Sequence, residues 1–258
     1  MTTPFTYEFG YSWWIVWGHL VPIALFGGLA LTGLRFGWWR SVVITFTALA
    51  VWGISGLLIT HYLFALNLPA ELPTSRFLSS GAGRVVDIGA GSGRASVGLL
   101  LARPRVTVTG VDIYRGYYGI ADNTPERFMR NARIAGVADR AEAKVGDARA
   151  LPLETGAYDG AISFAAIDHL PRATVPEALA EAARVLKPGG EFLLIVVNVD
   201  GWARFASPHA LGHHPAADSR RWRTLLESSG FQIEEQGTQP GALYFLSRKP
   251  RPSPRSLS

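Results

Sequence analysis

A turn built from three alternating glycines is the feature of this sequence that most clearly carries chemistry. An apolar, β-branched run over residues 85–88 contains Asp87 and leads directly into Gly89, Gly91 and Gly93. Glycines let a backbone approach a ligand with no side chains in the way, and a helix that starts after them directs its N-terminus at that ligand. The turn therefore predicts a pocket for a nucleoside-bearing cofactor.

Two further acids stand where such a cofactor would need them. The alternating run 105–111 reads as a second strand and ends at Asp112, 21 residues past Gly91. A carboxylate there can accept hydrogen bonds from both hydroxyls of a ribose. Asp147 follows another short alternating run. The plainer alternatives are that Asp112 caps a loop and that Asp147 is a turn residue.

The spacing separates this turn from the dinucleotide-binding pattern, because Arg94 stands where Gly-x-Gly-x-x-Gly would place its third glycine. The motif reads Asp-x-Gly-x-Gly-x-Gly, and it resembles the first motif of the class I S-adenosylmethionine (SAM) dependent methyltransferases. Residues 157–164 resemble the fourth strand of that family. Residues 184–190 and 191–197 resemble its helix end, Pro-Gly-Gly turn and buried strand. The resemblance covers about residues 80–250.

This resemblance implies an α/β fold, with a Rossmann-like, seven-stranded, mostly parallel sheet and helices on both faces. It implies SAM as the cofactor, S-adenosylhomocysteine as the product, and Asp147 near the adenine amino group. Motif and resemblance together give a set of expected cofactor-binding residues, which are Asp87, Gly89, Ala90, Gly91, Gly93, Asp112, Ile113, Gly146, Asp147, Ala148 and Phe164.

The methyl acceptor is expected beyond the ends of the strands. Methyl transfer from a sulfonium needs alignment and exclusion of water, and a base only if the acceptor must lose a proton. Asp168 and His169, after the fourth strand, are the catalytic candidates. Alternatively, Asp168 caps a helix beginning near Leu170 and His169 packs locally. The substrate-binding candidates are Tyr114, Tyr117, Tyr118 and His213, although the tyrosines could equally be core or surface aromatics.

Several side chains are expected to have no part in this chemistry. The histidines between residues 198 and 218 lack a recognisable ligand spacing, so no metal site is predicted. Pro125 suits the first position of a helix. Asn131 and Arg133 on that helix are expected to face solvent.

Two long uncharged runs precede this domain. Residues 9–34 and 41–70 contain no Asp, Glu, Lys or Arg, and each exceeds the ~20 residues needed to cross a bilayer. Tryptophans cluster towards the ends of the runs, as in an aromatic belt. We expect two transmembrane helices, at about 11–34 and 41–68, joined by a tight loop over 35–40. The alternative is a buried helical hairpin within a soluble protein.

The predicted organisation has three parts: a membrane domain over 1–72, a methyltransferase domain over 73–248, and a basic, disordered tail over 249–258. Loop charges do not decide the orientation in the membrane. A cytoplasmic catalytic domain is expected because SAM is made in the cytosol. The chain has no cysteine, which excludes a disulfide framework. Its net charge is +5, but the basic residues do not alternate with aromatic residues in the pattern of a nucleic-acid-binding surface.

These observations predict an integral-membrane SAM-dependent methyltransferase with a small, lipophilic or membrane-associated acceptor. Three alternatives remain open at this stage: a membrane protein that binds SAM without catalysis, a methyltransferase of a small soluble acceptor with the hairpin as an anchor only, and a nucleotide-dependent oxidoreductase.

Overall fold

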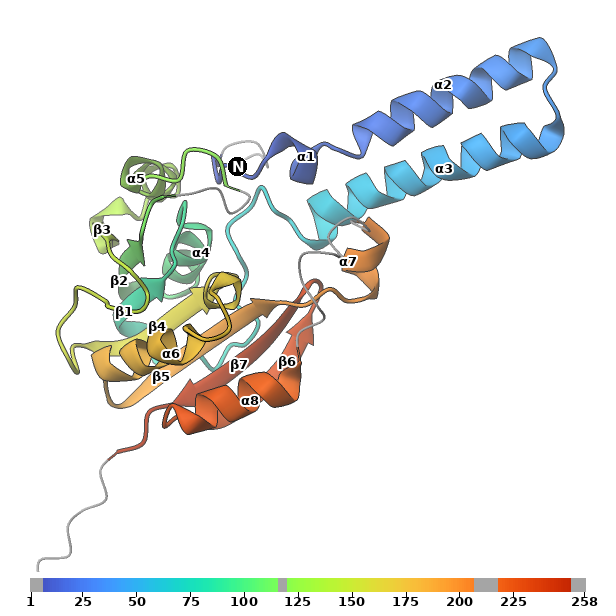
Figure 1. Ribbon diagram of the computed structural model, residues 1–258. Coiled ribbons are helices and arrows are strands. Elements are labelled where there is room, and N and C mark those ends of the chain that lie inside the picture. Colours follow the sequence, from blue (N-terminus) through green and yellow to red (C-terminus); the bar gives the residue numbers. More distant parts are fainter. Residues whose placement is uncertain (1–6, 116–119, 207–217, 252–258) are drawn as a thin grey trace, which may run out of the picture.

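The β-branched runs of the sequence pair into one seven-stranded sheet (Figure 1). The computed structural model describes residues 7–115, 120–206 and 218–251. The strand order is β3-β2-β1-β4-β5-β7-β6, with β1 to β5 parallel and β7 antiparallel to both neighbours. This confirms the predicted fold class. The strands are β1 Ala82–Ile88, β2 Arg105–Asp112, β3 Ala141–Val145, β4 Tyr158–Phe164, β5 Leu186–Val197, β6 Gln232–Gln239 and β7 Ala242–Arg248.

Helices cover both faces of the sheet and bury its two cores. Helices α4 (Arg94–Ala102) and α5 (Pro125–Ile134) pack on one face, and α6 (Val175–Val185) and α8 (Ser219–Ser228) pack on the other. On α6, the buried residues recur at the spacing of one helix face, Val175, Ala178, Leu179 and Ala182. Short turns of helix complete the connections: η2 Ala138–Arg140, η3 Ile167–His169 and α7 Gly201–Ala206.

Two local predictions for this domain were wrong. No helix starts near Leu170; η3 ends at His169, and α6 begins only at Val175. Asn131 does not face solvent. It is fully buried on the inner face of α5, because its amide bonds to main-chain groups of other segments. Pro125 does begin α5, and Arg133 is exposed.

The N-terminal apolar runs form a helical hairpin that projects from the domain (Figure 1). Its elements are α1 Trp13–Val16, α2 Leu20–Phe36, α3 Arg40–Leu58 and the π-helical turn η1 Ile59–Leu63. The first run is therefore not one helix over 11–34, since the chain breaks between α1 and α2. The turn of the hairpin is tighter than expected. Gly37, at a φ of 68°, ends α2, and the basic residue at each side belongs to a helix.

Small residues bring the two long helices together. Gly53 and Gly56 are buried, and a Cβ on Gly53 would lie 2.9 Å from the side chain of Ile23. By contrast, nothing lies within 4 Å of the position that a Cβ would take on Gly27 or Gly28. Close approach at Gly53 and Gly56 thus fixes the pairing, and the other two glycines face outward.

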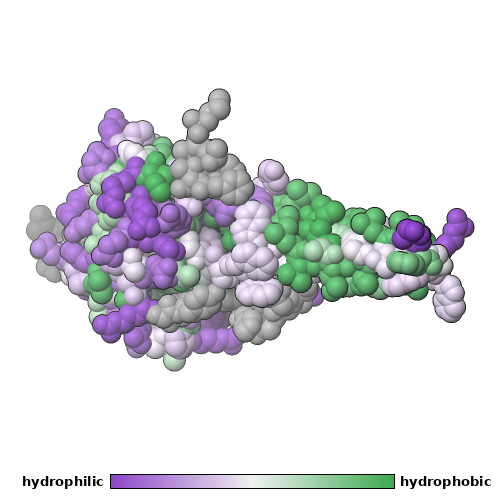
Figure 2. Space-filling view, turned by 90° about the horizontal axis from the view of Figure 1, so that it is seen from above, coloured by the Kyte–Doolittle hydropathy of each residue, from purple (hydrophilic) through white to green (hydrophobic). Residues whose placement is uncertain are grey.

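The outer surface of the hairpin is apolar. Figure 2 shows hydrophobic atoms along its length and hydrophilic atoms at its tip. Large side chains such as Leu31, Ile44 and Val51 are more than half exposed. One helix, Arg40–Leu63, is long and apolar enough to cross a membrane, with 17% of its most apolar window buried, and α2 is a shorter apolar helix of 17 residues.

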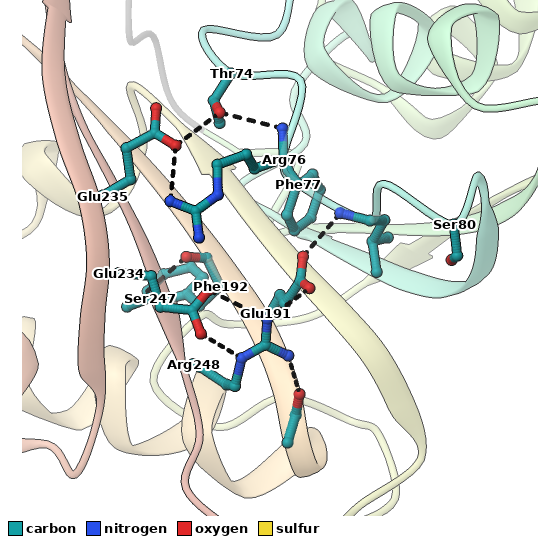
Figure 3. A network of polar contacts seen from close by, with 12 residues as sticks. Thr74, Arg76, Phe77, Ser80, Glu191, Phe192, Glu234, Glu235, Ser247 and Arg248 are labelled. Atoms are coloured by element: carbon teal, nitrogen blue, oxygen red, sulfur yellow. Dashed lines mark hydrogen bonds and ion pairs between the residues drawn. The ribbon is translucent and has the colours of Figure 1, made fainter.

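A polar network ties the linker after the hairpin to the domain (Figure 3). Glu191, in the middle of β5, accepts from the backbone N–H of Leu78 at 2.7 Å and from the Arg248 guanidinium at 3.0 Å. Thr74 donates to Glu235 on β6 at 3.0 Å. Arg248 also pairs with Glu234, which lowers the pKa of that carboxyl. The linker is therefore fixed to two strands, β5 and β6, before it enters β1.

Beyond β7, the chain stays paired for a short distance. The backbone of Lys249 exchanges hydrogen bonds with Gly189 and Gly190, at 2.8 and 2.9 Å, and its ammonium donates to the carbonyl of Leu186 at 2.7 Å. Burial lowers the pKa of the Lys249 ammonium. Most of the predicted basic tail, residues 252–258, lies outside the described residues.

Candidate active site

The glycine turn lies at the carboxyl end of β1 and depends on its glycines. Gly89, Gly91 and Gly93 adopt φ angles of 76°, 52° and 85°, in the left-handed region that favours glycine. A Cβ on Gly89 would lie only 2.2 Å from the Cβ of Ala166, after β4. The turn thus presents bare backbone at the edge where the ends of parallel strands meet.

Asp112 is bonded to this turn. Its Oδ2 accepts from the Gly91 N–H at 3.0 Å, and its Oδ1 accepts from the Tyr114 N–H at 2.8 Å and from Asn123 Nδ2 at 3.1 Å. A carboxylate accepts about four hydrogen bonds. Room for about one ribose hydroxyl remains, and a second hydroxyl would have to replace a present partner. Asn123 was not among the residues predicted for this site.

The third predicted acid, Asp147, joins the same edge through β3. The N–H of the preceding Gly146 donates to the carbonyl of Asp112 at 2.9 Å. Arg149 makes a forked ion pair with the Asp147 carboxylate, with a shortest contact of 2.6 Å, and lowers the pKa of that carboxyl. An adenine amino group reaching Asp147 would share the carboxylate with Arg149. The neighbouring Ala148 is half-buried.

Asp87 lies beneath the turn rather than on its surface. Its side chain is 1% exposed, and Ser96 Oγ on α4 donates to its Oδ2 at 2.6 Å. Burial raises the pKa of the Asp87 carboxyl to about 7, and the charge of Asp112 adds to that effect while the Ser96 hydrogen bond opposes it. The carboxyl joins β1 to α4 directly under the glycines.

The residues after β4 close the other side. Asp168 Oδ2 accepts from the Val197 N–H at 2.8 Å and so fixes η3 to the end of β5. Its Oδ1 is buried with no partner among the residues that the structure describes. His169 ends η3 and is half-buried. Asp168 thus has a structural partner on β5 and a second, buried oxygen that has no partner among the described residues.

Backbone strain marks the same edge. Tyr114 directly follows Ile113 after β2, and Ala165 directly follows Phe164 of β4; their φ angles are 48° and 49°. Non-glycine residues in this left-handed region are strained and persist only where the surrounding structure holds them in place. Residues of this kind cluster at functional sites. Burial, with the charge of Asp112 next in effect, raises the pKa of the Tyr114 hydroxyl. The other predicted substrate residues, Tyr117, Tyr118 and His213, lie outside the described residues.

Comparison with known proteins identifies the family of the domain that carries this edge. Residues 85–190 match the family model described as a methyltransferase domain. The α/β domain therefore belongs to the class I SAM-dependent methyltransferases. In fold, it resembles a putative SAM-dependent methyltransferase from Methanococcus maripaludis, with a TM-score of 0.57 and 21% identity over 79% of this chain and 94% of that chain.

Curated methyltransferases are similar in sequence to this one. A ubiquinone/menaquinone biosynthesis C-methyltransferase from Methylobacterium nodulans is 35% identical over 56% of this chain and 58% of its own length. A malonyl-[acyl-carrier protein] O-methyltransferase from Methylococcus capsulatus is 34% identical over 58% of this chain and 49% of its own length. The chain thus spans about half the length of the curated relatives that it matches.

This methyltransferase domain carries an N-terminal segment directly over its glycine turn. Asn131 on α5 accepts from the Glu8 N–H at 2.9 Å and donates to the carbonyls of Glu8 and Ser92 at 3.1 and 2.9 Å. Ser92 Oγ in turn donates to the carbonyl of Phe9 at 2.7 Å. We call residues 7–12 the strap. It precedes the hairpin and contacts the glycine turn itself.

The other end of the hairpin reaches the same turn through Arg94. Its guanidinium donates to the carbonyls of Leu68, Phe64 and Ala65 at 2.9, 2.9 and 3.2 Å, and lies over the Phe164 ring at 5.4 Å. The residue that separates this motif from the dinucleotide pattern therefore joins the hairpin to the methyltransferase domain. Sequence reasoning noted the mismatch at position 94 but not this role.

Proposed function

We propose that the protein is an integral-membrane methyltransferase that transfers the methyl group of SAM to a small, lipophilic or membrane-associated acceptor. The observation that carries the proposal is the double attachment of an apolar hairpin to the cofactor turn. The strap enters the hairpin from Ser92, and the chain leaving it is bonded to Arg94. The hairpin and the proposed cofactor site are thus connected at the glycine turn, which keeps the site at the base of the hairpin.

The hairpin has the properties expected of helices in lipid. Arg40–Leu63 has 24 residues, and at 1.5 Å per residue spans about 36 Å, more than the hydrocarbon core of a bilayer. The 17 residues of α2 are at the lower end of the spanning range. We propose two spans, with the catalytic domain and both flanking segments in the cytoplasm, where SAM is made.

Hydroxyl groups in the hairpin need no water. Five of them donate to the carbonyl four residues earlier in their own helix, at 2.8 to 2.9 Å; they belong to Thr32, Thr45, Thr47, Ser55 and Thr60. In hydrocarbon, each unsatisfied polar group costs several kcal/mol. Because each of these hydroxyls is hydrogen-bonded within its own helix, it can face lipid without this penalty.

The residues at the carboxyl edge fit SAM. Bare backbone at the glycine turn admits the cofactor closely, and the Asp112 carboxylate has an acceptor position left for the ribose. When bound, SAM supplies an electrophilic methyl group on a sulfonium. The work of the protein is then to orient the acceptor and to exclude water. If the acceptor must lose a proton, the buried Oδ1 of Asp168 is the proposed proton acceptor. The named relatives, a quinone-biosynthesis enzyme and an acyl-carrier-protein enzyme, support a lipophilic or carrier-bound acceptor class.

Calorimetric titration tests the cofactor assignment. The protein in lipid nanodiscs should bind SAM and S-adenosylhomocysteine saturably and should not bind NADH. Asp112→Ala should abolish binding of both sulfur ligands, because it removes the ribose acceptor and releases the glycine turn. Asp139→Ala, at an exposed position on η2, is the matched control and should bind normally. Normal SAM binding by Asp112→Ala would refute the site.

Transfer of label from SAM then tests the acceptor class. Lipid-soluble quinols and phospholipids in the nanodisc should become labelled, and small soluble alcohols and amines should not. Labelling of soluble acceptors alone would leave the hairpin as an anchor only. SAM binding without transfer to any acceptor would favour a binding protein over an enzyme.

A further inference from the structure

A cavity of about 300 Å³ lies at the base of the hairpin, apart from the residues assigned to the cofactor. The strap, α1 and the loop after η1 form its walls, where Figure 1 shows these segments meeting between the hairpin and the α/β domain. Five aromatic residues line it, Tyr7, Phe9, Tyr11, Trp13 and Trp17, together with two residues that carry polar side chains, Asn67 and Glu8. The Glu8 carboxylate is paired with Arg130 on α5 at 2.6 Å.

We propose that this cavity binds the head group of an amphiphilic methyl acceptor, and that the head group is a flat, conjugated ring. The inference rests on the proposed function and names the substrate class of its site. Faces of aromatic side chains attract other flat rings in offset or edge-on contacts. Pockets for small molecules begin at about 300 Å³, so this one holds a ring system and leaves an alkyl tail outside.

Both walls of the cavity are hydrogen-bonded to the proposed cofactor site. On one side, Phe9 lines the cavity and its carbonyl accepts from Ser92 in the glycine turn at 2.7 Å. On the other side, Asn67 precedes Leu68, whose carbonyl accepts from Arg94 at 2.9 Å. A ring held between these walls therefore lies beside the turn that binds SAM, as a methyl acceptor must.

One polar group of the lining is suited to recognising an oxygen on the ring. Asn67 Nδ2 lies 3.2 Å from His61 Nδ1, and the His61 ring lies 4.5 Å from the ring of Trp17. The amide nitrogen donates to the histidine, which fixes the orientation of the amide. Its second N–H and its carbonyl have no other partner among the described residues, and they can bond a ring carbonyl or hydroxyl.

The tail of the ligand has a surface to lie on. Trp13 at the cavity and Trp14 beside it are 50% and 68% exposed, and the exposed apolar side chains of α2 begin at Leu20, four residues after α1 ends. Tryptophans at that level suit the membrane interface. An alkyl tail leaving the cavity would continue along α2 into the bilayer.

Binding of a ring-bearing amphiphile to matched variants tests this inference. The probe is a decyl-substituted 1,4-naphthoquinone, titrated calorimetrically into the protein in phosphatidylcholine nanodiscs with S-adenosylhomocysteine bound, and corrected with empty nanodiscs. Trp13→Ala removes a ring of the cavity. Trp14→Ala is the control, because Trp14 belongs to the same helix, is similarly exposed and loses the same edge-on contact of 5.0 Å between the two rings.

We expect saturable binding to the wild type, about tenfold weaker binding to Trp13→Ala, and a change of less than about twofold for Trp14→Ala. Asn67→Leu should weaken binding about fivefold, the loss of one hydrogen bond. S-adenosylhomocysteine should bind all four proteins equally, and decanol should not compete with the probe.

Three results would overturn the inference while the proposed function stands. Equal losses in Trp13→Ala and Trp14→Ala would mean that the cavity is not the site. Decanol competing as well as the naphthoquinone would mean that no ring is recognised. Weaker binding of S-adenosylhomocysteine to Trp13→Ala would make the cavity part of the cofactor site. A wild type that binds neither ligand would refute both the proposed function and this inference.

Discussion

The buried carboxyl of Asp87 makes the stability of this protein depend on pH in an unusual direction. Burial raises its pKa to about 7 in the folded state, against 3.8 for an ordinary aspartate. Between these two values the folded protein holds a proton that the unfolded chain has released. Stability therefore falls as the pH rises through this window, and becomes constant above about pH 7.

The size of the effect follows from that difference. One unit of pKa corresponds to about 1.4 kcal/mol, so the whole window carries about 4 kcal/mol, of which about 3 kcal/mol falls between pH 5 and pH 8. Asp87→Asn has no proton to release. Relative to that variant, the wild type should lose about 3 kcal/mol of unfolding free energy between pH 5 and pH 8. Subtracting the two curves cancels every other titrating group.

Urea denaturation of both proteins in nanodiscs, followed by far-UV circular dichroism at a series of pH values, measures this difference. Ser96→Ala supplies a second check. Ser96 donates to the carboxylate and so favours its charged form. Removing that donor should raise the pKa of Asp87 further and extend the loss of stability to higher pH. A difference between wild type and Asp87→Asn that stays constant from pH 5 to pH 8 would refute the reasoning.

Three further substitutions probe the attachment of the hairpin. Arg94→Ala removes the donors to the loop after η1. This variant should lose about 1–2 kcal/mol of unfolding free energy and show faster hydrogen exchange in residues 64–70. Arg133→Ala, at an exposed site, is the control and should show neither effect. Asn131→Leu leaves one N–H and two carbonyls of the strap and turn without partners, and should cost about 2–4 kcal/mol and weaken SAM binding; unchanged affinity would contradict the contact between strap and turn. Gly56→Ala places a Cβ about 2.2 Å from the His19 ring and should loosen the hairpin in crosslinking between α2 and α3, while Gly27→Ala, with nothing within 4 Å, should not.

Much of the catalytic domain could be predicted from the sequence because its signals are local. Alternating β-branched runs predicted β1 and β2, and the apolar run over 191–197 predicted most of β5. The expected Pro-Gly-Gly turn was wrong in its place, because β5 already begins at Leu186 and includes these residues. The position of Asp112 beside the turn follows from strands ending at one edge, whereas its hydrogen bond to the Gly91 N–H was not predicted. The long apolar runs likewise predicted a hairpin, since length and composition decide whether a segment stays out of a soluble core.

Other features depend on partners that sequence spacing does not reveal. The strap binds through main-chain carbonyls. Every residue has such a carbonyl, so the residue types of the strap did not predict its contact with the glycine turn. Arg94 acts on carbonyls 26 to 30 residues earlier in the chain. Asn131 did leave a signal, because with Phe128 and Ala132 it shares the buried spacing of one helix face; its polar side chain outweighed that pattern in the prediction.

The linker network of Figure 3 has a consequence for how the enzyme would select its acceptors. Strap, Arg94 and linker attach both chain ends of the hairpin to the domain, which restrains the hairpin relative to the sheet. In the membrane enzyme that we propose, the cofactor turn is then kept at one depth relative to the lipid head groups. Molecules of similar shape would be distinguished by how far below the surface they carry their reactive atom. Bilayer thickness would thereby become a determinant of substrate choice.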